Sequence, residues 1–121
     1  MQTTTFEFPH NARNTYTAVR HLFERTRTRF TDIRLDNGAT YVGTLDANSK
    51  FSGKGIYTYP DGSVYDGLWE NGLRSGTGKM MWADGSQYIG NWKNYHQYGN
   101  GTMKWANGRQ FSGRWKHGSF V

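Results

Sequence analysis

The segment of this chain that comes closest to a phosphate-binding motif is Gly-Thr-Gly-Lys at residues 76–79. A phosphate loop needs a glycine, four further residues and then Gly-Lys-Ser/Thr, so that backbone N–H groups surround the phosphates and the hydroxyl binds Mg²⁺. Here Met80 follows the lysine, and the same Gly-x-Gly pattern recurs at residues 53–55 and 99–101. The recurrence indicates an architectural role, so we expect no nucleotide cofactor.

Histidines and paired aspartates are the other candidates for catalysis or metal binding. The four histidines have no ligand spacing and lie at His10, His21, His96 and His117. The absence of cysteine excludes a thiolate metal site and a disulfide framework. Asp61 and Asp84 each precede a glycine in the same phase, which assigns them to turns rather than to a carboxylate pair. With no recognisable Ser, His and Asp set, we expect no metal site, no catalytic residue and no enzyme activity.

Aromatic side chains, 17% of the sequence, are the remaining candidates for binding. Exposed rings beside basic residues can stack on single-stranded nucleic acid, with each base contributing about 1–3 kcal/mol. In this chain the rings recur at fixed positions, so packing explains them without a ligand. Packing combined with partner binding is the second interpretation, and nucleic-acid binding is the third.

A five-residue unit, Tyr-Asp-Gly-Leu-Trp at residues 65–69, recurs along the chain and must set its fold. Its other copies begin at Tyr41, Tyr88 and Phe111, so the leading aromatic steps by 24 residues and then twice by 23. Each copy follows an Asn-Gly or Asp-Gly pair, and a Gly-x-Gly pair lies between copies. A period in this range is typical of a repeat architecture.

This pattern resembles the MORN repeat, whose unit begins Tyr-x-Gly-x-Trp and continues through Gly-x-Gly and an aromatic-rich second strand to an Asp-Gly turn. Leu45 stands where the tryptophan belongs, residues 44–52 hold one extra residue, and Arg29 and Thr31 occupy the first Gly-x-Gly slots. The resemblance divides residues 31–121 into units at 41–64, 65–87 and 88–110 and a partial unit at 111–121. It implies a non-enzymatic interaction module that binds protein partners, often helical ones, or membrane phospholipids.

Period-two alternation places Tyr65, Gly67 and Trp69 on one face of a strand. We therefore predict a mainly β protein, an elongated single antiparallel sheet of stacked hairpins with one aromatic face. As an adaptor, scaffold or inhibitor it would bind an amphipathic helix of a partner through this face. The predicted partner-binding residues are Tyr41, Tyr59, Tyr65, Trp69, Trp82, Tyr88, Trp92 and Trp105.

Residues 1–30 read as an N-terminal extension that contains an amphipathic helix at about 14–25. Its apolar positions recur at three to four residues and include Tyr16, Val19, Leu22, Phe23 and Phe30. We expect this helix to cap the first edge of the sheet, and its occupation of the aromatic groove is the alternative. No signal peptide or long apolar segment is recognisable, which predicts a cytoplasmic location, or a peripheral one at a membrane.

The net charge of +6 is unevenly placed: residues 1–35 hold six arginines against three acidic residues, and no acidic residue follows Asp84 near the C-terminus. A basic surface there would bind anionic phospholipid or nucleic acid, which is the alternative function. The alternative interpretation is that these charges bind no partner and form a solvated surface that keeps the sheet soluble. The residues of this predicted surface are Lys93, Lys104, Arg109, Arg114 and Lys116.

The last unit supplies a first strand at 111–115 and then six residues, too few for the turn and second strand of the earlier units. Such an edge presents unpaired backbone groups that pair with another chain. We therefore predict a homodimer through this edge, with the tail folding back into a monomer as the alternative. The predicted contacts are Phe111, Trp115, Phe120 and Val121.

Overall fold

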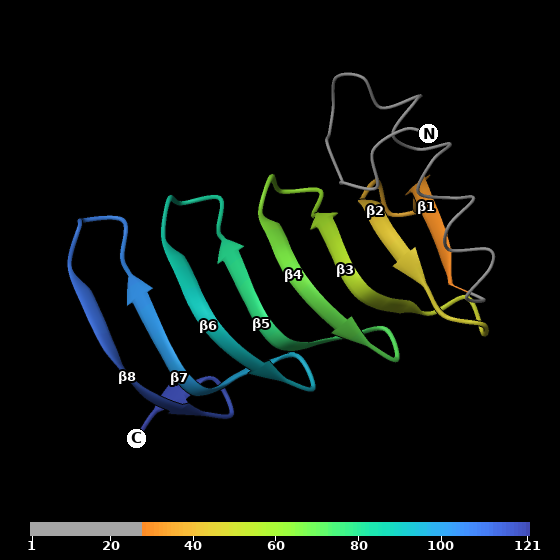
Figure 1. Cartoon of the computed structure of the whole chain (residues 1–121). Helices are drawn as coiled ribbons and strands as arrows, with labels where there is room; N and C mark the ends of the chain where they lie inside the picture. The colour runs from red at the N-terminus through yellow and green to blue at the C-terminus, as the bar shows by residue number, and fades with distance from the viewer. Residues whose placement is uncertain (1–27) are drawn as a thin grey trace, which may run out of the picture.

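The structure, a computed structural model, describes residues 28–121. They form a single open antiparallel sheet in which each strand pairs with its neighbours along the chain (Figure 1). The nine strands are β1 (Arg29–Arg34), β2 (Thr40–Leu45), β3 (Phe51–Thr58), β4 (Val64–Glu70), β5 (Leu73–Met81), β6 (Gln87–Lys93), β7 (His96–Lys104), β8 (Gln110–Lys116) and β9 (Ser119–Phe120). The predicted fold class is confirmed, whereas the predicted helix at 14–25 lies outside the described residues.

Two kinds of turn alternate at the two edges of the sheet. The upper edge in Figure 1 carries the turns at 36–38, 60–62, 83–85 and 106–108, each with its glycine at a positive φ. In each, an Asp or Asn side chain accepts the backbone N–H two residues on, as Asp61 does from Ser63 at 2.8 Å. These hydrogen bonds from Ser63 hold the pKa of the Asp61 carboxyl below its ordinary value. The aspartates are thus turn residues, as the sequence predicts.

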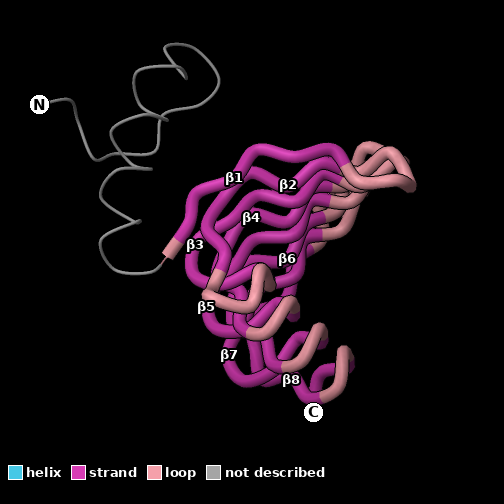
Figure 2. Tube along the Cα trace, turned by 90° about the vertical axis from the view of Figure 1, so that its right-hand side faces the viewer, coloured by secondary structure: helices cyan, strands magenta, loops and turns pink. Residues whose placement is uncertain are grey.

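The lower edge carries shorter turns, at 71–72, 94–95 and 117–118, together with one longer turn at 46–49. In the short turns both residues have positive φ, which is the backbone form that closes a two-residue hairpin. Figure 2 shows that the strands bend on their way between the two edges, which curves the sheet. The register shifts by two residues within the hairpin of each unit: Gly67 pairs with Gly78 but Trp69 with Arg74, so residues 75–77 of β5 lie opposite Leu68 alone, and this irregularity recurs with the repeat.

A row of glycines crosses the sheet at its centre, strand by strand from β2 to β8. The paired residues in this row are Gly43, Gly55, Gly67, Gly78, Gly90, Gly101 and Gly113. A tyrosine ring from each unit lies across the row: a Cβ added to Gly78 would be 2.5 Å from Cζ of Tyr65. The Tyr65 hydroxyl donates to the backbone oxygen of Leu68 at 2.9 Å. The predicted packing of rings over the central glycine is what buries Tyr65 completely.

The core is a single row of alternating tyrosine and tryptophan rings. Tyr65 contacts both Trp69 and Trp92 edge to face, with ring centroids 5.1 and 5.4 Å apart. Tyr88 continues the row in the same way, at 5.2 Å from Trp92 and 5.3 Å from Trp115. The Trp92 indole N–H also donates to the backbone oxygen of Gly78 at 3.2 Å. Trp69 and Trp92 are therefore each held by the tyrosines of two successive units, and Trp115 is held by Tyr88 and Phe111.

The first unit fills the place of its missing tryptophan differently. Phe51 stacks on Tyr41 with ring centroids 3.8 Å apart and an angle of 10° between the planes. Leu45 pairs with Phe51 and is buried, so the two smaller groups share the site that a tryptophan occupies elsewhere. Phe30, placed by its spacing on the predicted helical stripe, instead lies buried in β1. The sheet thus begins at Arg29, and Phe30 pairs with Thr44, so alternation along β1 places its side chain on the face opposite that of Tyr41 and Leu45.

At the C-terminal end, the expectation that residues 116–121 are too few to form a second strand is wrong. The short turn at 117–118 leaves Ser119 and Phe120 to form β9 against Lys116 and Trp115. The Val121 N–H then donates to the Arg114 backbone oxygen at 2.9 Å. This half of the β8 edge is covered, while the half at 110–113 has no strand beyond it in the described sheet.

Burial raises the pKa of the phenols of Tyr41, Tyr65 and Tyr88 above the ordinary value of about 10. A group whose folded pKa is raised stabilises the fold fully below its unfolded pKa and loses that contribution as pH rises above it. We therefore expect the urea midpoint to fall steeply above a pH of about 10. Phenolate absorbance followed together with urea unfolding measures this, and Tyr65→Phe should make the fall shallower. Ionisation of these three phenols at the ordinary pH while the sheet stays folded would contradict the assignment.

Candidate functional site

The eight aromatic residues predicted to bind a partner divide into core and surface. Five of them are almost completely buried, which leaves them to packing rather than to direct contact: Tyr41, Tyr65, Trp69, Tyr88 and Trp92. Tyr59 and Trp82 are half-buried, and Trp105 is 38% exposed. These three occupy equivalent positions just before the upper turns and step by 23 residues. Among these eight residues, the rings open to a partner are thus one for each unit.

Two hollows lie along this line of rings. The first, of about 480 Å³, is lined by Tyr59, Asp61, Ser63, Arg74, Met80, Trp82, Trp92, Asn94, Tyr95, His96 and Gln97. The second, of about 380 Å³, is lined by Trp82, Gln97, Met103, Trp105, Trp115, Gly118, Ser119 and Phe120. Trp82 and Gln97 border both hollows, so the two adjoin and together form one groove, which we call the aromatic groove.

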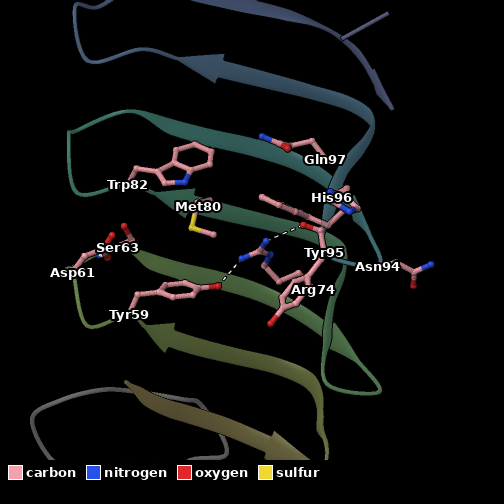
Figure 3. Close-up of a pocket in the computed structure, with 11 residues that line it drawn as sticks. Tyr59, Asp61, Ser63, Arg74, Met80, Trp82, Asn94, Tyr95, His96 and Gln97 are labelled. Atoms are coloured by element: carbon pink, nitrogen blue, oxygen red, sulfur yellow. Dashed lines mark hydrogen bonds between the residues drawn. The ribbon is translucent and has the colours of Figure 1, made fainter. Parts of the chain in front are cut away.

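Arg74 lies in the first hollow, among aromatic rings (Figure 3). One guanidinium nitrogen donates to the Tyr59 hydroxyl at 2.5 Å and another to the Tyr95 backbone oxygen at 2.8 Å. Its Cζ is 4.4 Å from the ring centroid of Tyr95 and 4.7 Å from that of Trp92. The third nitrogen, Nε, is buried without a hydrogen-bond partner. The first hollow therefore has a cation held between rings.

The backbone of Tyr95 is unusual for its residue type. Its φ of 82° lies in the left-handed region, which costs a residue other than glycine roughly 1–3 kcal/mol. The equivalent positions in the neighbouring short turns are Gly72 and Gly118, with φ of 80° and 85°. The contact of the Tyr95 ring with Arg74 is the interaction in the structure that offsets this cost. The pair of Arg74 and Tyr95 makes the first hollow differ from the regular pattern of the repeat.

The residue pair of Arg74 and Tyr95 was missed by the sequence analysis, although a signal was present. At the position of Arg74 the other units carry Phe51 and Gln97, so a cation breaks the column. Burial raises the pKa of the Tyr59 phenol, and the neighbouring Arg74 charge opposes this shift. Burial is the larger effect on this pKa, so Tyr59 stays a neutral phenol at pH 7.

The five residues of the predicted basic surface are not gathered in one place. Lys93 and Lys116 end β6 and β8 at the lower edge, whereas Lys104 and Arg109 flank the turn between β7 and β8 at the upper edge. Arg114 lies within β8 and is exposed. Because β7 runs its full length between the two edges, a flat membrane or a nucleic-acid backbone has no single basic strip to follow.

The residues predicted for self-association form a ring cluster beside the C-terminal edge. Phe120 lies 4.4 Å from Phe111 and 5.4 Å from Trp115, measured between ring centroids. Trp115 is buried in the tyrosine–tryptophan row, so the exposed members are Phe111, Phe120 and Val121. The homodimer stays a prediction, and the part of the β8 edge that remains open for strand pairing is residues 110–113.

Two further observations concern the described part of the chain. Among residues 28–121, no group of three or more histidine, aspartate or glutamate side chains is placed to hold a metal ion. Within the same residues, no helix is long and apolar enough to cross a membrane.

Comparison with known proteins agrees with the repeat seen in the sheet. The family model of the MORN repeat matches the chain three times in succession, at residues 47–64, 65–87 and 88–108, about half of its length. A search of curated proteins found no match. The MORN repeat is a non-catalytic repeat family. Three consecutive matches, together with hairpins of the same period in the structure, show that the chain belongs to the MORN-repeat family.

Proposed function

We propose that this protein is a non-enzymatic interaction module, an adaptor, scaffold or inhibitor, which binds a protein partner in the aromatic groove. The observation that carries the proposal is the pair of adjoining hollows, lined by Tyr59, Trp82 and Trp105. Tyrosine and tryptophan are the types that dominate binding hot spots, because they bury a large area with few rotamers to fix. Regular repeats explain the buried rings, but packing alone does not require these outer rings to border open hollows.

The spacing of the hollows fits an amphipathic helix. One hairpin contributes two strands, and neighbouring strands lie roughly 4.8 Å apart, so equivalent positions in successive units lie about 10 Å apart. An α-helix rises 1.5 Å per residue, which places side chains seven residues apart on one face about 10.5 Å from each other. A helix crossing the strands would thus present one apolar side chain to each hollow. This is the helix-in-groove mode of recognition.

Arg74 adds a polar preference to the first hollow. Its side chain lines the hollow, so the positive charge of its guanidinium favours an acidic group on the ligand. A helix with an acidic residue three or four positions from its apolar anchor would supply one, since such residues are neighbours on a helix surface. The preferred ligand is therefore a helix that combines apolar anchors at seven-residue spacing with a carboxylate beside one of them.

We expect Tyr95→Gly to abolish capture of the partner without weakening the fold. The change removes one wall of the first hollow and gives the turn the residue that both neighbouring turns carry. Relief of strain is worth roughly 1–3 kcal/mol, against about 0.5–1 kcal/mol for the lost cation–π contact. Stability should therefore stay constant or rise by about 1 kcal/mol. Urea unfolding measures this, and affinity capture from extract with quantitative mass spectrometry measures binding.

The matched control is Ile89→Ala, which removes an exposed side chain from the opposite face of the sheet. Proteins captured by the native chain should be retained by this control and lost from Tyr95→Gly. A synthetic peptide from the captured protein should then become helical on binding, as circular dichroism reports. Equal capture by both variants would show that the groove is not the binding surface.

A further inference from the structure

A further pocket lies at the lower edge of the sheet, between the last two short turns. Its volume is about 490 Å³, within the range of small-molecule sites. It is bordered by the ends of β6 and β8, the beginning of β7 and the two short turns. The residues that line it are Lys93, Asn94, His96, Tyr98, Lys116 and His117. We call it the lower-edge pocket.

Hairpin geometry brings these side chains together from distant parts of the sequence. Lys93 pairs with His96 across the first short turn, and Lys116 pairs with Ser119 across the second. The two lysines hold the same position in successive units, which puts their backbones about 10 Å apart. The His96 and His117 rings approach to 6.4 Å between centroids, and the Lys93 ammonium lies 4.9 Å from the ring centroid of Tyr98.

Each of the six lining side chains can donate a hydrogen bond, and none is a carboxylate. Two ammonium groups on one small pocket repel each other, and Glu70, which holds the position of Lys93 one unit earlier, is not among the residues that line it. An anion bound between them would relieve that repulsion. Phosphate suits such a site, because it carries about two negative charges at neutral pH and three acceptor oxygens.

The fold does not require this charge. One unit earlier, the positions of Lys93, His96 and Tyr98 are occupied by Glu70, Leu73 and Ser75. The strands and the short turn form there equally well, with an acidic residue in place of the lysine. Cationic residues at this edge are therefore a property of the last two units and not of the repeat.

We propose that the lower-edge pocket binds the phosphate group of a small soluble phosphate monoester. The ammonium groups of Lys93 and Lys116 face the anion from two strands. The imidazoles of His96 and His117, with Asn94 and the Tyr98 hydroxyl, complete a set of donors around it. This site lies away from the rings of Trp82 and Trp105, but it adjoins the first hollow of the aromatic groove, because Asn94 and His96 line both.

The test is an NMR titration of the full isotope-labelled chain with inorganic phosphate, then with glycerol 3-phosphate, at constant low ionic strength set with chloride. The expected result is a saturable shift of the His96 and His117 ring signals with both compounds. Lys93→Gln with Lys116→Gln should weaken binding at least tenfold. Lys104→Gln with Arg109→Gln removes the same two charges at the upper edge and should change it less than twofold.

A second variant guards against misfolding. Lys93→Glu installs the residue that the preceding unit carries at this position, so the sheet should keep its melting temperature while phosphate binding is lost. Equal weakening by the upper-edge pair would show that net charge, not the pocket, attracts phosphate. The absence of a saturable shift would also overturn the proposal, as would a response to phosphatidic acid vesicles without one to the soluble compounds.

Discussion

Replacement of Trp92 by alanine is expected to lower the free energy of unfolding by about 3–5 kcal/mol, the range for removing a large aromatic side chain from a core. Trp92 is 3% exposed and lies at the middle of the ring row, between Tyr65 and Tyr88. Its loss also leaves the Gly78 backbone oxygen without its indole donor and Arg74 without one of its rings. Because a domain of this size has a total stability of about 5–15 kcal/mol, the variant should be close to unfolding.

Urea denaturation followed by circular dichroism measures this change. Ile89→Ala, three residues earlier in β6 and 53% exposed, serves as the matched control and should shift stability by at most about 0.5 kcal/mol. The comparison of the two variants distinguishes the two roles that the sequence predicts for Trp92, which are packing in the core and binding a partner. A loss below about 1 kcal/mol would mean that Trp92 is not a core residue.

Gly78→Ala should be nearly as damaging, although it adds only one methyl group. The new Cβ would lie 2.5 Å from Cζ and 2.6 Å from Cε1 of Tyr65, well inside contact distance. That ring is fully buried and held by the hydrogen bond of its hydroxyl to Leu68, so it has nowhere to move. Overpacking of this kind costs typically about 1–3 kcal/mol, and the rigid surroundings place Gly78→Ala at the upper end or beyond.

The neighbouring Thr77 provides the control, because it is exposed and its side chain alternates to the other face. Thr77→Ala should leave the melting temperature nearly unchanged, while Gly78→Ala lowers it by several degrees in differential scanning calorimetry. A melting temperature equal for both variants would show that the tyrosine ring does not need the glycine row.

The repeat period was enough to predict the sheet, its strand order and the column of rings over glycine. These features depend on the spacing of residues along the chain and on turn residues, both of which can be read directly from the sequence. The two-residue turn at His117 and Gly118 was overlooked, since the judgement of residues 116–121 assumed a second strand as long as β7. A turn that needs only two residues leaves enough chain for β9.

The distinction between buried and open rings was not predictable in the same way. Tyr65 and Tyr59 lie on the same face and have the same side chain, yet one is covered and the other borders the groove. Alternation assigns a face, but the cover over Tyr65 comes from tryptophans of two different units. Arg74 and Tyr95 were missed for a different reason. Each departs from the residue type at the equivalent positions of the other units, and an analysis that looks for recurring residue types passes over such departures.

The lateral order of the sheet has a consequence for how this protein changes in evolution. Every strand has its extensive contacts with its immediate neighbours along the chain. A core built in this way has no centre, so a duplicated 23-residue segment would enter between two existing units without disturbing packing elsewhere. Each insertion would lengthen the molecule by about 10 Å. Gene duplication can therefore change the length of this protein in steps of one whole repeat.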